Sequence, residues 1–398
     1  MRVLFVTHNV PRFDGDAAGS FVLRLAVALQ QQGHRVDVIA PGGAGVDAKD
    51  HLEGVDIERI PYASNTNMTL AYVGTMAESV RKSWSARFAL IGLLRALRRA
   101  TQQRIRQAAR SGDRYDVVHA HWWFPAGLAL WRAFREGGSA SRLPLVITMH
   151  GSDVRLAQHT RPAHPIMRAV LAQAAVCTTV SSWLADAVLR IAPEANVTVA
   201  PMPVDTRHFR MGDIATPRSG ILFVGRLNEQ KGLALLVDAM ARPSLAGATL
   251  DVVGEGPDTD ALRARAVSLG IEARIRWHGA LPQPALVPLY QRAVCVAMPS
   301  REEGLGLVAV EAQLCATPVV AFSSGGLTDV VRPDAGGSLV MPGDVDALSV
   351  SIGRLLDDPI DAAARGQAAR AFMLAQFAPT HVAQRYAALY LEACRGTR

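Results

Sequence analysis

The chain has 398 residues, of which 49% are hydrophobic, and a formal net charge of +7. This length and composition predict two or three domains with full hydrophobic cores. The four cysteines, Cys177, Cys295, Cys315 and Cys394, lie in apolar segments without CxxC spacing, which argues against a disulfide or zinc framework and favours a reduced, cytoplasmic protein. The opening run MRVLFVTHNV predicts a first strand and not a signal peptide, and we find no run of roughly 18 uncharged apolar residues that could span a membrane.

Short apolar runs alternate with helical patterns along most of the chain, which predicts an α/β protein with parallel sheets covered by helices. The polar, proline-containing segment 205–219, DTRHFRMGDIATPRS, predicts a linker between two Rossmann-like halves. In the first half, the expected strands are 3–7, 35–40, 55–60, 117–120, 145–149, 176–180 and 197–201. In the second half, they are 221–225, 249–254, 274–277, 295–298, 318–322 and 338–341.

The first expected strand leads into a glycine-containing loop, HNVPRFDGDAAGSF, before a helix. Gly15 and Gly19 would let the backbone turn tightly there. The loop lacks the GxGxxG spacing of a dinucleotide fold, so we do not expect a hydride-transferring dehydrogenase. Gly19 either allows close approach of the backbone to a ligand or serves the turn alone.

Segment 81–114 is strongly basic, with ten Arg and Lys residues against one acid, Asp113. Part of it also has apolar residues at helical spacing, namely Trp84, Phe88, Ile91, Leu94 and Leu97. A basic amphipathic helix of this kind suits an anionic membrane surface. Because no nucleic-acid-binding motif occurs, we do not expect nucleic acid as the partner. The alternative is a helix packed on its own domain with a solvated basic face.

Two strand ends in the first half carry histidines. The segment DVVHAHWWF places His119, His121, Trp122 and Trp123 at the end of one strand, and ITMHGSD places 150–153 at the end of the next. Ligands of open α/β sheets gather at the carboxyl ends of the strands. No third or fourth ligand has suitable spacing for a metal, so we expect ligand contact or simple packing.

The second half has a loop with two cations, GRLNEQKG, which joins a strand to a helix. Arg226 can bind phosphate oxygens in a bidentate manner, Lys231 adds a point charge, and the helix N-terminus adds free amides. Gly225 and Gly232 bound this loop. It therefore predicts a diphosphate site, although an ordinary surface loop with two cations is the alternative. Farther on, Asp258 precedes a helix, and we interpret it as a helix cap and not as a metal ligand.

The segment PSREEGLGLVAVEAQLCATPVV places Glu303 just before a helix and Glu311 within it. A buried carboxylate is costly unless it has hydrogen-bond donors, and sugar hydroxyls would supply them. A glycosidase pair is disfavoured, since eight helical residues separate the two backbones by about 12 Å, whereas catalytic carboxyl pairs lie roughly 5 to 10 Å apart. A solvated Glu303 and a satisfied core Glu311 remain the alternative.

These motifs resemble a known family. Glu303-x7-Glu311, EAxxCxTPVVA and Gly325–Gly326–Leu327, together with the GRx4KG loop and the HGxD element at 150–153, resemble the retaining glycosyltransferases of family 4. The resemblance implies the GT-B fold, in which two Rossmann-like domains face each other across a cleft. It implies an acceptor domain over 1–205, a nucleotide-sugar donor domain over 206–378, and a final helix over 379–398 that returns to the first domain.

The resemblance also implies roles for individual residues. Arg226 and Lys231 would hold the diphosphate, Glu311 the ribose, and Glu303 the donor sugar, while His150 would lie over the anomeric region. The implied catalytic residues are His150, Glu303, Arg226 and Lys231. The backbone near Gly19, Gly225, Leu281 and Leu307 would complete the donor site, with the base near Gly279 and Leu281, and His121, Trp122 and Asp153 would contact the acceptor.

The implied reaction moves a hexose from a nucleotide-diphosphate sugar to a saccharide or lipid-linked acceptor with retention, and needs no metal or other cofactor. We expect a role in surface polysaccharide or glycolipid synthesis, in the cytoplasm or at the inner membrane face. The chain departs from the family at Leu305, where an aromatic is usual, and at Ala316, where glycine is usual. A GT-B epimerase and a non-catalytic carbohydrate- or lipid-surface-binding protein stay open, as does the choice among UDP, GDP and ADP.

Overall fold

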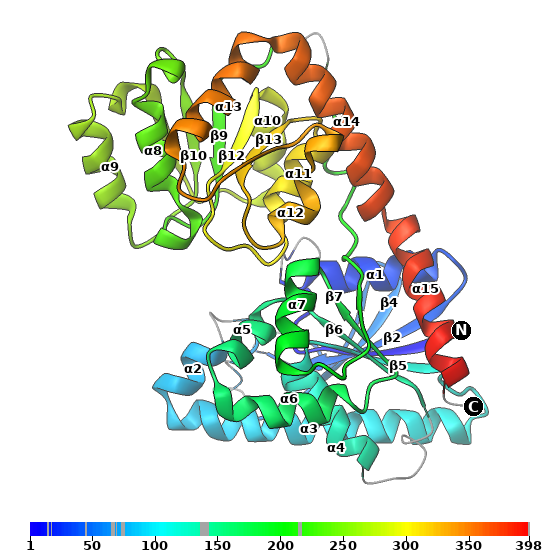
Figure 1. Cartoon of the computed structure of the whole chain (residues 1–398). Helices are drawn as coiled ribbons and strands as arrows, with labels where there is room; N and C mark the ends of the chain where they lie inside the picture. Colours follow the sequence, from blue (N-terminus) through cyan, green and yellow to red (C-terminus); the bar gives the residue numbers. More distant parts are fainter. Residues whose placement is uncertain are drawn as a thin grey trace. The chain divides into compact units, whose positions relative to one another are not determined.

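The computed structural model describes residues 1–13, 16, 18–43, 46–64, 68, 70–72, 76–135, 143–213 and 217–396. Gly15 of the first loop lies outside these residues. The contacts divide the chain into two units (Figure 1): an N-terminal unit, Met1–Pro203 with Pro379–Arg398, and a C-terminal unit, Val204–Ala378. Each unit is a mainly parallel sheet with helices on both faces, which confirms the predicted α/β class.

The sheet of the N-terminal unit has the strand order β3-β4-β2-β1-β5-β6-β7-β8. All of its neighbouring strands are parallel except β3, which runs antiparallel to β4. We did not predict β3, because its sequence KDHL is short and mostly polar. The strands are β1 Arg2–Val6, β2 Arg35–Pro41, β3 Lys49–Leu52, β4 Val55–Ile60, β5 Val117–His121, β6 Leu145–Met149, β7 Val176–Thr179 and β8 Val197–Val199.

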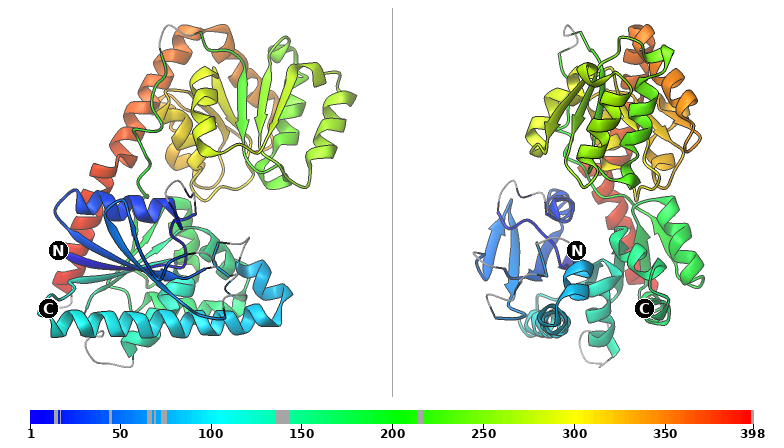
Figure 2. Two further views of the ribbon diagram at one scale, coloured as in Figure 1. Left: turned by 180° about the vertical axis from the view of Figure 1, so that it is seen from behind. Right: turned by 90° about the vertical axis from the view of Figure 1, so that its left-hand side faces the viewer.

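Helices cover both faces of this sheet. Helices α1 and α15 pack against each other on one face, and the long α3 packs with α4 on the other (Figures 1 and 2). The helices of this unit are α1 Ser20–Gln30, α2 Met76–Lys82, α3 Trp84–Arg110, α4 Leu128–Arg135, α5 Ser152–Gln158, α6 His164–Leu171, α7 Ser182–Ile191 and α15 Pro379–Gly396.

Buried hydrogen bonds attach α15 to this sheet. The Tyr390 hydroxyl lies 2.8 Å from Nδ1 of His119, and Nε2 of that histidine lies 2.7 Å from Oγ1 of Thr148. The Tyr386 hydroxyl donates to the carbonyl of Ala200 at 3.0 Å. All four of these side chains are fully buried. The last helix of the chain is therefore part of the core of the N-terminal unit.

The sheet of the C-terminal unit is wholly parallel, in the order β11-β10-β9-β12-β13-β14. Helices α8, α9 and α13 pack on one face, and α11 packs with α10 and α14 on the other (Figure 1). The strands are β9 Ile221–Val224, β10 Leu250–Val253, β11 Ile275–Gly279, β12 Cys295–Met298, β13 Val319–Phe322 and β14 Ser338–Val340. The helices are α8 Leu233–Met240, α9 Thr259–Ser268, α10 Gln283–Arg292, α11 Leu307–Leu314, α12 Leu327–Val330, α13 Val345–Asp357 and α14 Pro359–Phe377.

Replacing Tyr390 by phenylalanine tests how α15 is held. The variant leaves a buried nitrogen of His119 without its partner, so we expect the free energy of unfolding to fall by about 1–3 kcal/mol. Equilibrium unfolding in urea, followed by tryptophan fluorescence, measures the change. Leu391→Ala is the matched control, since Leu391 lies next in the same helix and is 48% exposed. Equal stability of Tyr390→Phe and the control would contradict the anchoring role.

Candidate functional site

Both sheets have a point where the strand order reverses. In the N-terminal unit it lies between β1 and β5, and in the C-terminal unit between β9 and β12. At such a point the loops that follow the two strands diverge to opposite faces, so ligands bind there, outside the carboxyl ends. The predicted cation loop follows β9, and the loop with Glu303 follows β12. The sequence motifs and the strand order thus both place the candidate site at the carboxyl ends of β9 and β12.

An ion pair joins the two loops at the switch point of the C-terminal unit. Nζ of Lys231 donates to Oε1 of Glu303, and Oγ of Ser300 donates to the same oxygen at 3.2 Å. Glu303 is only 8% exposed. The loop that carries Lys231 is shaped by Asn228, whose side chain accepts a hydrogen bond from the Lys231 N–H. The sequence indicated both charged residues, but not that they pair with each other.

Close backbone packing fixes this ion pair. A Cβ on Gly232, whose φ is +68°, would lie 2.0 Å from the carbonyl oxygen of Pro299. A Cβ on Gly325, whose φ is +54°, would lie 2.2 Å from the carbonyl oxygen of Glu303. That oxygen also accepts a hydrogen bond from the Gly326 N–H at 2.8 Å. Only glycine fits these contacts, which explains the glycines of both motifs in physical terms.

Other predicted donor residues lie at the same edge. Arg226 follows Gly225 directly after β9 and is exposed, and its side chain makes no hydrogen bond or ion pair with any residue that the structure describes. Leu307 is the first residue of α11, where backbone amides lack partners within the helix. Leu281 follows β11 and is half-buried. The guanidinium group of Arg226 is thus available to an anion.

Glu311 lies in α11 and is held by two donors from α10. Nε2 of Gln283 donates to Oε1 at 2.9 Å, and the Tyr290 hydroxyl donates to Oε2 at 3.0 Å. Burial, followed by the nearby Glu311 carboxylate, raises the pKa of Tyr290 well above its ordinary value, so the phenol stays protonated. We did not predict Gln283 or Tyr290 as site residues, because no charge or spacing in the sequence links either side chain to Glu311.

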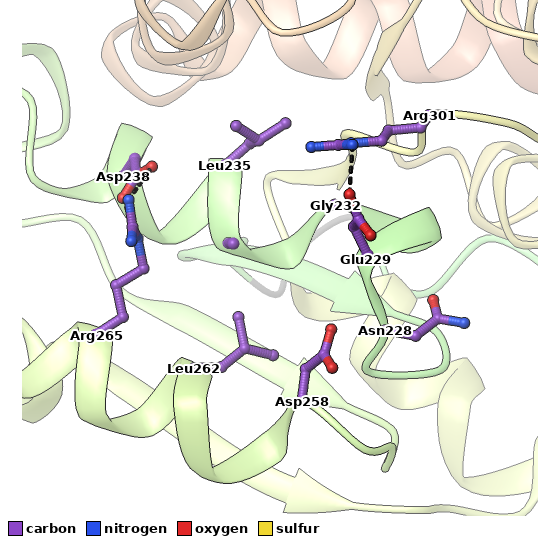
Figure 3. A pocket seen from close by; sticks show the side chains of 10 residues that line it. Asn228, Glu229, Gly232, Leu235, Asp238, Asp258, Leu262, Arg265 and Arg301 are labelled. Atoms are coloured by element: carbon purple, nitrogen blue, oxygen red, sulfur yellow. Dashed lines mark hydrogen bonds and ion pairs between the residues drawn. The ribbon is translucent and has the colours of Figure 1, made fainter.

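A surface pocket lies beside the cation loop, between α8 and α9 (Figure 3). Its arginines are already paired: Arg301 with Glu229 at 2.6 Å and Arg265 with Asp238 at 2.5 Å. Asp258 also lines the pocket and is the N-cap residue of α9, as predicted, but its side chain makes no capping hydrogen bond. Along the described ranges, no group of three or more His, Cys, Asp or Glu residues could hold a metal ion.

A second hollow lies at the carboxyl ends of β10 and β11. Gly254, Glu255, Trp277 and Gly279 help to line it. Arg263 also lines it, with its guanidinium carbon 5.5 Å from the centre of the Trp277 ring. Gly279 lines this hollow, and the resemblance implies that the base of the donor nucleotide binds near Gly279. It is thus an aromatic and polar cavity beside the cation loop.

The predicted residues of the N-terminal unit also come together at strand ends. Nδ1 of His121, the last residue of β5, lies 3.2 Å from Nε2 of His150, which follows β6. The ring of Trp122 lies 4.3 Å from that of His150. Burial, followed by the neighbouring His8, lowers the pKa of His121 to about 3, and burial also lowers that of His150 well below its ordinary value. Both imidazoles are therefore neutral near pH 7.

Asp153 and Gly19 have clear structural tasks. The carboxylate of Asp153 accepts hydrogen bonds from the backbone N–H groups of His150, Gly151 and Trp123, at 3.0 to 3.2 Å. Burial nevertheless raises its pKa to about 6. A Cβ on Gly19, whose φ is +65°, would lie 2.4 Å from the carbonyl oxygen of Asn9. In this structure, Asp153 holds the loop after β6, and Gly19 packs against the loop after β1.

The long helix α3 differs from its predicted pattern. Leu97 is fully buried, but Trp84, Phe88 and Ile91 are 73%, 70% and 45% exposed, so the five apolar residues do not share one buried stripe. The face packed on the sheet is formed by Ala86, Ala89, Leu93, Leu97, Thr101, Ile105 and Ala108. Among the described residues, no helix is long and apolar enough to cross a membrane.

Comparison with known proteins agrees with the motifs and the fold. Residues 205–372 match the family model described as "Glycosyl transferases group 1", and residues 18–208 match the model described as "Glycosyltransferase Family 4". A D-inositol 3-phosphate glycosyltransferase of Mycobacterium avium is 30% identical over 408 residues, which cover 96% of this chain and 90% of the relative. A glycogen synthase of Mycobacterium tuberculosis is 28% identical over 417 residues, which cover 100% of this chain and 96% of the relative.

Solved structures show the same architecture. A sucrose-phosphate synthase from Thermosynechococcus elongatus superposes with a TM-score of 0.76, covers 100% of both chains, and is 23% identical. At that identity the likeness concerns the fold. With the two family models and the 30% identical relative, it shows that this chain belongs to the group 1, family 4 glycosyltransferases and has the GT-B fold.

Proposed function

We propose that this glycosyltransferase is a retaining hexosyltransferase whose C-terminal unit holds a nucleotide-diphosphate sugar without a metal ion or other cofactor. The observation that carries the proposal is the charged edge between β9 and β12, where Lys231 pairs with Glu303 and Arg226 remains unpaired among the described residues. A diphosphate bound there would meet two cations and the amides at the start of α11. Two cations can neutralise the leaving diphosphate where other enzymes use a metal.

Glu303 and Lys231 would change partners when the donor binds. In the structure the ammonium group of Lys231 is bound to the Glu303 carboxylate. A phosphate oxygen would share or take that donor, which frees carboxylate lone pairs for hydroxyl groups of the donor sugar. Glu311 would accept hydrogen bonds from the ribose, as the resemblance implies, with its carboxylate held in place by Gln283 and Tyr290. The hollow beside Gly279, together with Leu281, would receive the base of UDP, GDP or ADP.

The proposed reaction breaks the bond between the anomeric carbon and the diphosphate oxygen and forms a bond to an acceptor hydroxyl on the same face. The proton of that hydroxyl passes to an oxygen of the leaving diphosphate. Arg226 and Lys231 stabilise the charge that develops there. We assign His150, with His121 and Trp122, to sugar binding by the N-terminal unit, since all three lie at carboxyl ends of its strands.

We further propose that the acceptor is a saccharide or a lipid-linked saccharide, used in surface polysaccharide or glycolipid synthesis, and that the enzyme works in the cytoplasm at an anionic membrane surface. Trp84, Phe88 and Ile91 are spaced by four and three residues, so they lie on one face of α3. Large apolar side chains so exposed on a basic helix fit an anionic bilayer, where the rings enter the headgroup region and arginines meet phosphates. The guanidinium carbon of Arg87 lies 4.4 Å from the centre of the Trp84 ring. Farther along the same helix, Arg95, Arg99 and Arg106 are also exposed.

Isothermal titration of UDP-, GDP- and ADP-sugars tests the donor site. We expect the wild type to bind one nucleotide class, and Lys231→Gln to bind it about tenfold to a hundredfold more weakly, because a hydrogen bond from a charged group contributes roughly 1.5–3 kcal/mol. Glu311→Gln should weaken binding in the same direction. Arg242→Gln is the matched control, since Arg242 pairs with Asp346 in the same unit and lines neither of the two hollows. If no nucleotide binds to the wild type, the transferase proposal fails and a non-catalytic binding protein becomes the better interpretation. Product analysis with an acceptor separates transfer from epimerisation.

Flotation with lipid vesicles tests the membrane surface. The wild type should bind vesicles that contain phosphatidylglycerol and not vesicles of phosphatidylcholine alone. Trp84→Ser/Phe88→Ser should lose at least about tenfold in affinity, since burying each of these side chains contributes roughly 1.5–3 kcal/mol. Met341→Ser/Ile360→Ser is the control, because these residues are 70% and 83% exposed outside α3. Equal binding by both double variants would remove α3 as the contact, and RNA binding at α3 would favour the other class of partner.

A further inference from the structure

The switch point of the N-terminal unit contains buried polar atoms without partners. His8 and Asn9 follow β1, and His121 ends β5, so the three residues flank the point where the strand order reverses. Within the described residues, Nδ1 of His8, Oδ1 of Asn9 and Nε2 of His121 make no hydrogen bond. A buried polar atom left unpaired loses its hydrogen bonds to water and gains none in the protein, which destabilises the fold. Three at one strand edge indicate that a ligand with hydroxyl or amide groups completes the site.

The rings around these atoms form one continuous edge. His8 packs edge-on against Trp122 at 4.3 Å between ring centres, and Trp122 lies 4.3 Å from His150. Nε1 of Trp122 already donates to Oγ of Ser152 at 3.2 Å. Trp122 therefore offers the site its apolar ring, while the unpaired atoms of His8, Asn9 and His121 offer the polar contacts.

This edge is uncharged, in contrast with the switch point of the C-terminal unit. Burial lowers the pKa of His8 to about 4, so near pH 7 its imidazole is neutral and has one donor and one acceptor nitrogen. Among the described charged groups on or against these loops, Arg12 pairs with Asp16, Arg59 donates to the Pro11 carbonyl and pairs with Asp50, and Asp153 faces the backbone of its own loop. Neutral donors and acceptors beside an apolar ring suit the hydroxyl groups of a sugar and give a phosphate no cation.

We propose that His8 and Asn9 are sugar-binding residues, which form hydrogen bonds through Nδ1 of His8 and the side-chain amide of Asn9 to hydroxyl groups of an uncharged sugar. The proposal rests on the proposed transferase function, and the sugar is either that of the donor or that of the acceptor. Gly19 supports the site, because only glycine allows α1 to begin against the Asn9 carbonyl. Nε2 of His121, the third unpaired atom, is a further hydrogen-bonding group of this site, in keeping with the sugar-binding role proposed for that residue above.

Binding and kinetics of His8→Phe and Asn9→Leu test the proposal. His8→Phe keeps a ring against Trp122 and removes both nitrogens, so the nucleoside diphosphate alone should bind as in the wild type. If the sugar belongs to the donor, the Kd of the nucleotide sugar should rise about tenfold, as expected for one lost hydrogen bond of roughly 1.4 kcal/mol. If it belongs to the acceptor, the acceptor KM should rise by a similar factor. His8→Asn returns a polar atom near the Nδ1 position and should recover part of the loss.

Two outcomes overturn the proposal. One is that His8→Phe and Asn9→Leu leave both the Kd of the nucleotide sugar and the KM of the acceptor unchanged, which means that water alone occupies the edge. The other is that they weaken binding of the nucleoside diphosphate equally, which indicates general damage to the fold.

A separate experiment does not need the donor. Adding millimolar glucose, galactose or inositol to the wild type should shift the ring-nitrogen NMR signal of His8, and glucose 6-phosphate should cause no larger shift. If that shift is absent as well, the site does not bind sugar.

Discussion

The reversal of strand order within each parallel sheet is the constraint on which the rest of the structure depends. Between β1 and β5, and between β9 and β12, the two neighbouring strands are followed by connections that leave toward opposite faces of the sheet. The carboxyl ends of two neighbouring strands are therefore left uncovered by helices, and a ligand can reach them. The candidate site residues that follow β1, β5, β9 and β12 lie at these uncovered strand ends. What each unit can bind depends on which side chains the chain puts at that edge.

In the C-terminal unit these side chains are charged, and burying them costs desolvation free energy. The Lys231 side chain is partly buried and that of Glu303 is largely buried. Such a pair stabilises a fold only when good geometry and additional hydrogen bonds offset the free-energy cost of desolvation. Ser300 supplies one extra bond, and backbone contacts at Gly232 and Gly325 fix the geometry. Such a pair is weak evidence for stability, and we propose that it serves anion binding, because a phosphate can replace the carboxylate beside the ammonium group.

The sequence predicted the local features of this fold well and the long-range ones poorly. Every predicted strand is present with its ends within two residues, because short buried strands are continuous apolar runs. The edge strand β3 has no such run and was not predicted. Helical spacing placed Trp84 and Leu97 on one apolar stripe, yet only Leu97 is buried, since periodicity does not say which side of a helix meets the sheet. The Lys231–Glu303 pair joins residues 72 positions apart, and its partners are set by topology alone.

The two switch points also differ in how they respond to protons. In the C-terminal unit, the raised pKa of Tyr290 keeps a donor on Glu311, so this carboxylate is held in place at any pH near neutrality. In the N-terminal unit, the lowered pKa values of His8 and His121 keep both imidazoles uncharged over the same range. Because a protonated imidazole would have no acceptor nitrogen, neutrality preserves the ability to accept a hydroxyl proton in a hydrogen bond. Glycosyl transfer needs a stabilised anionic leaving group and an uncharged hydroxyl nucleophile, and we propose that the charged edge of one sheet and the neutral edge of the other supply these two environments.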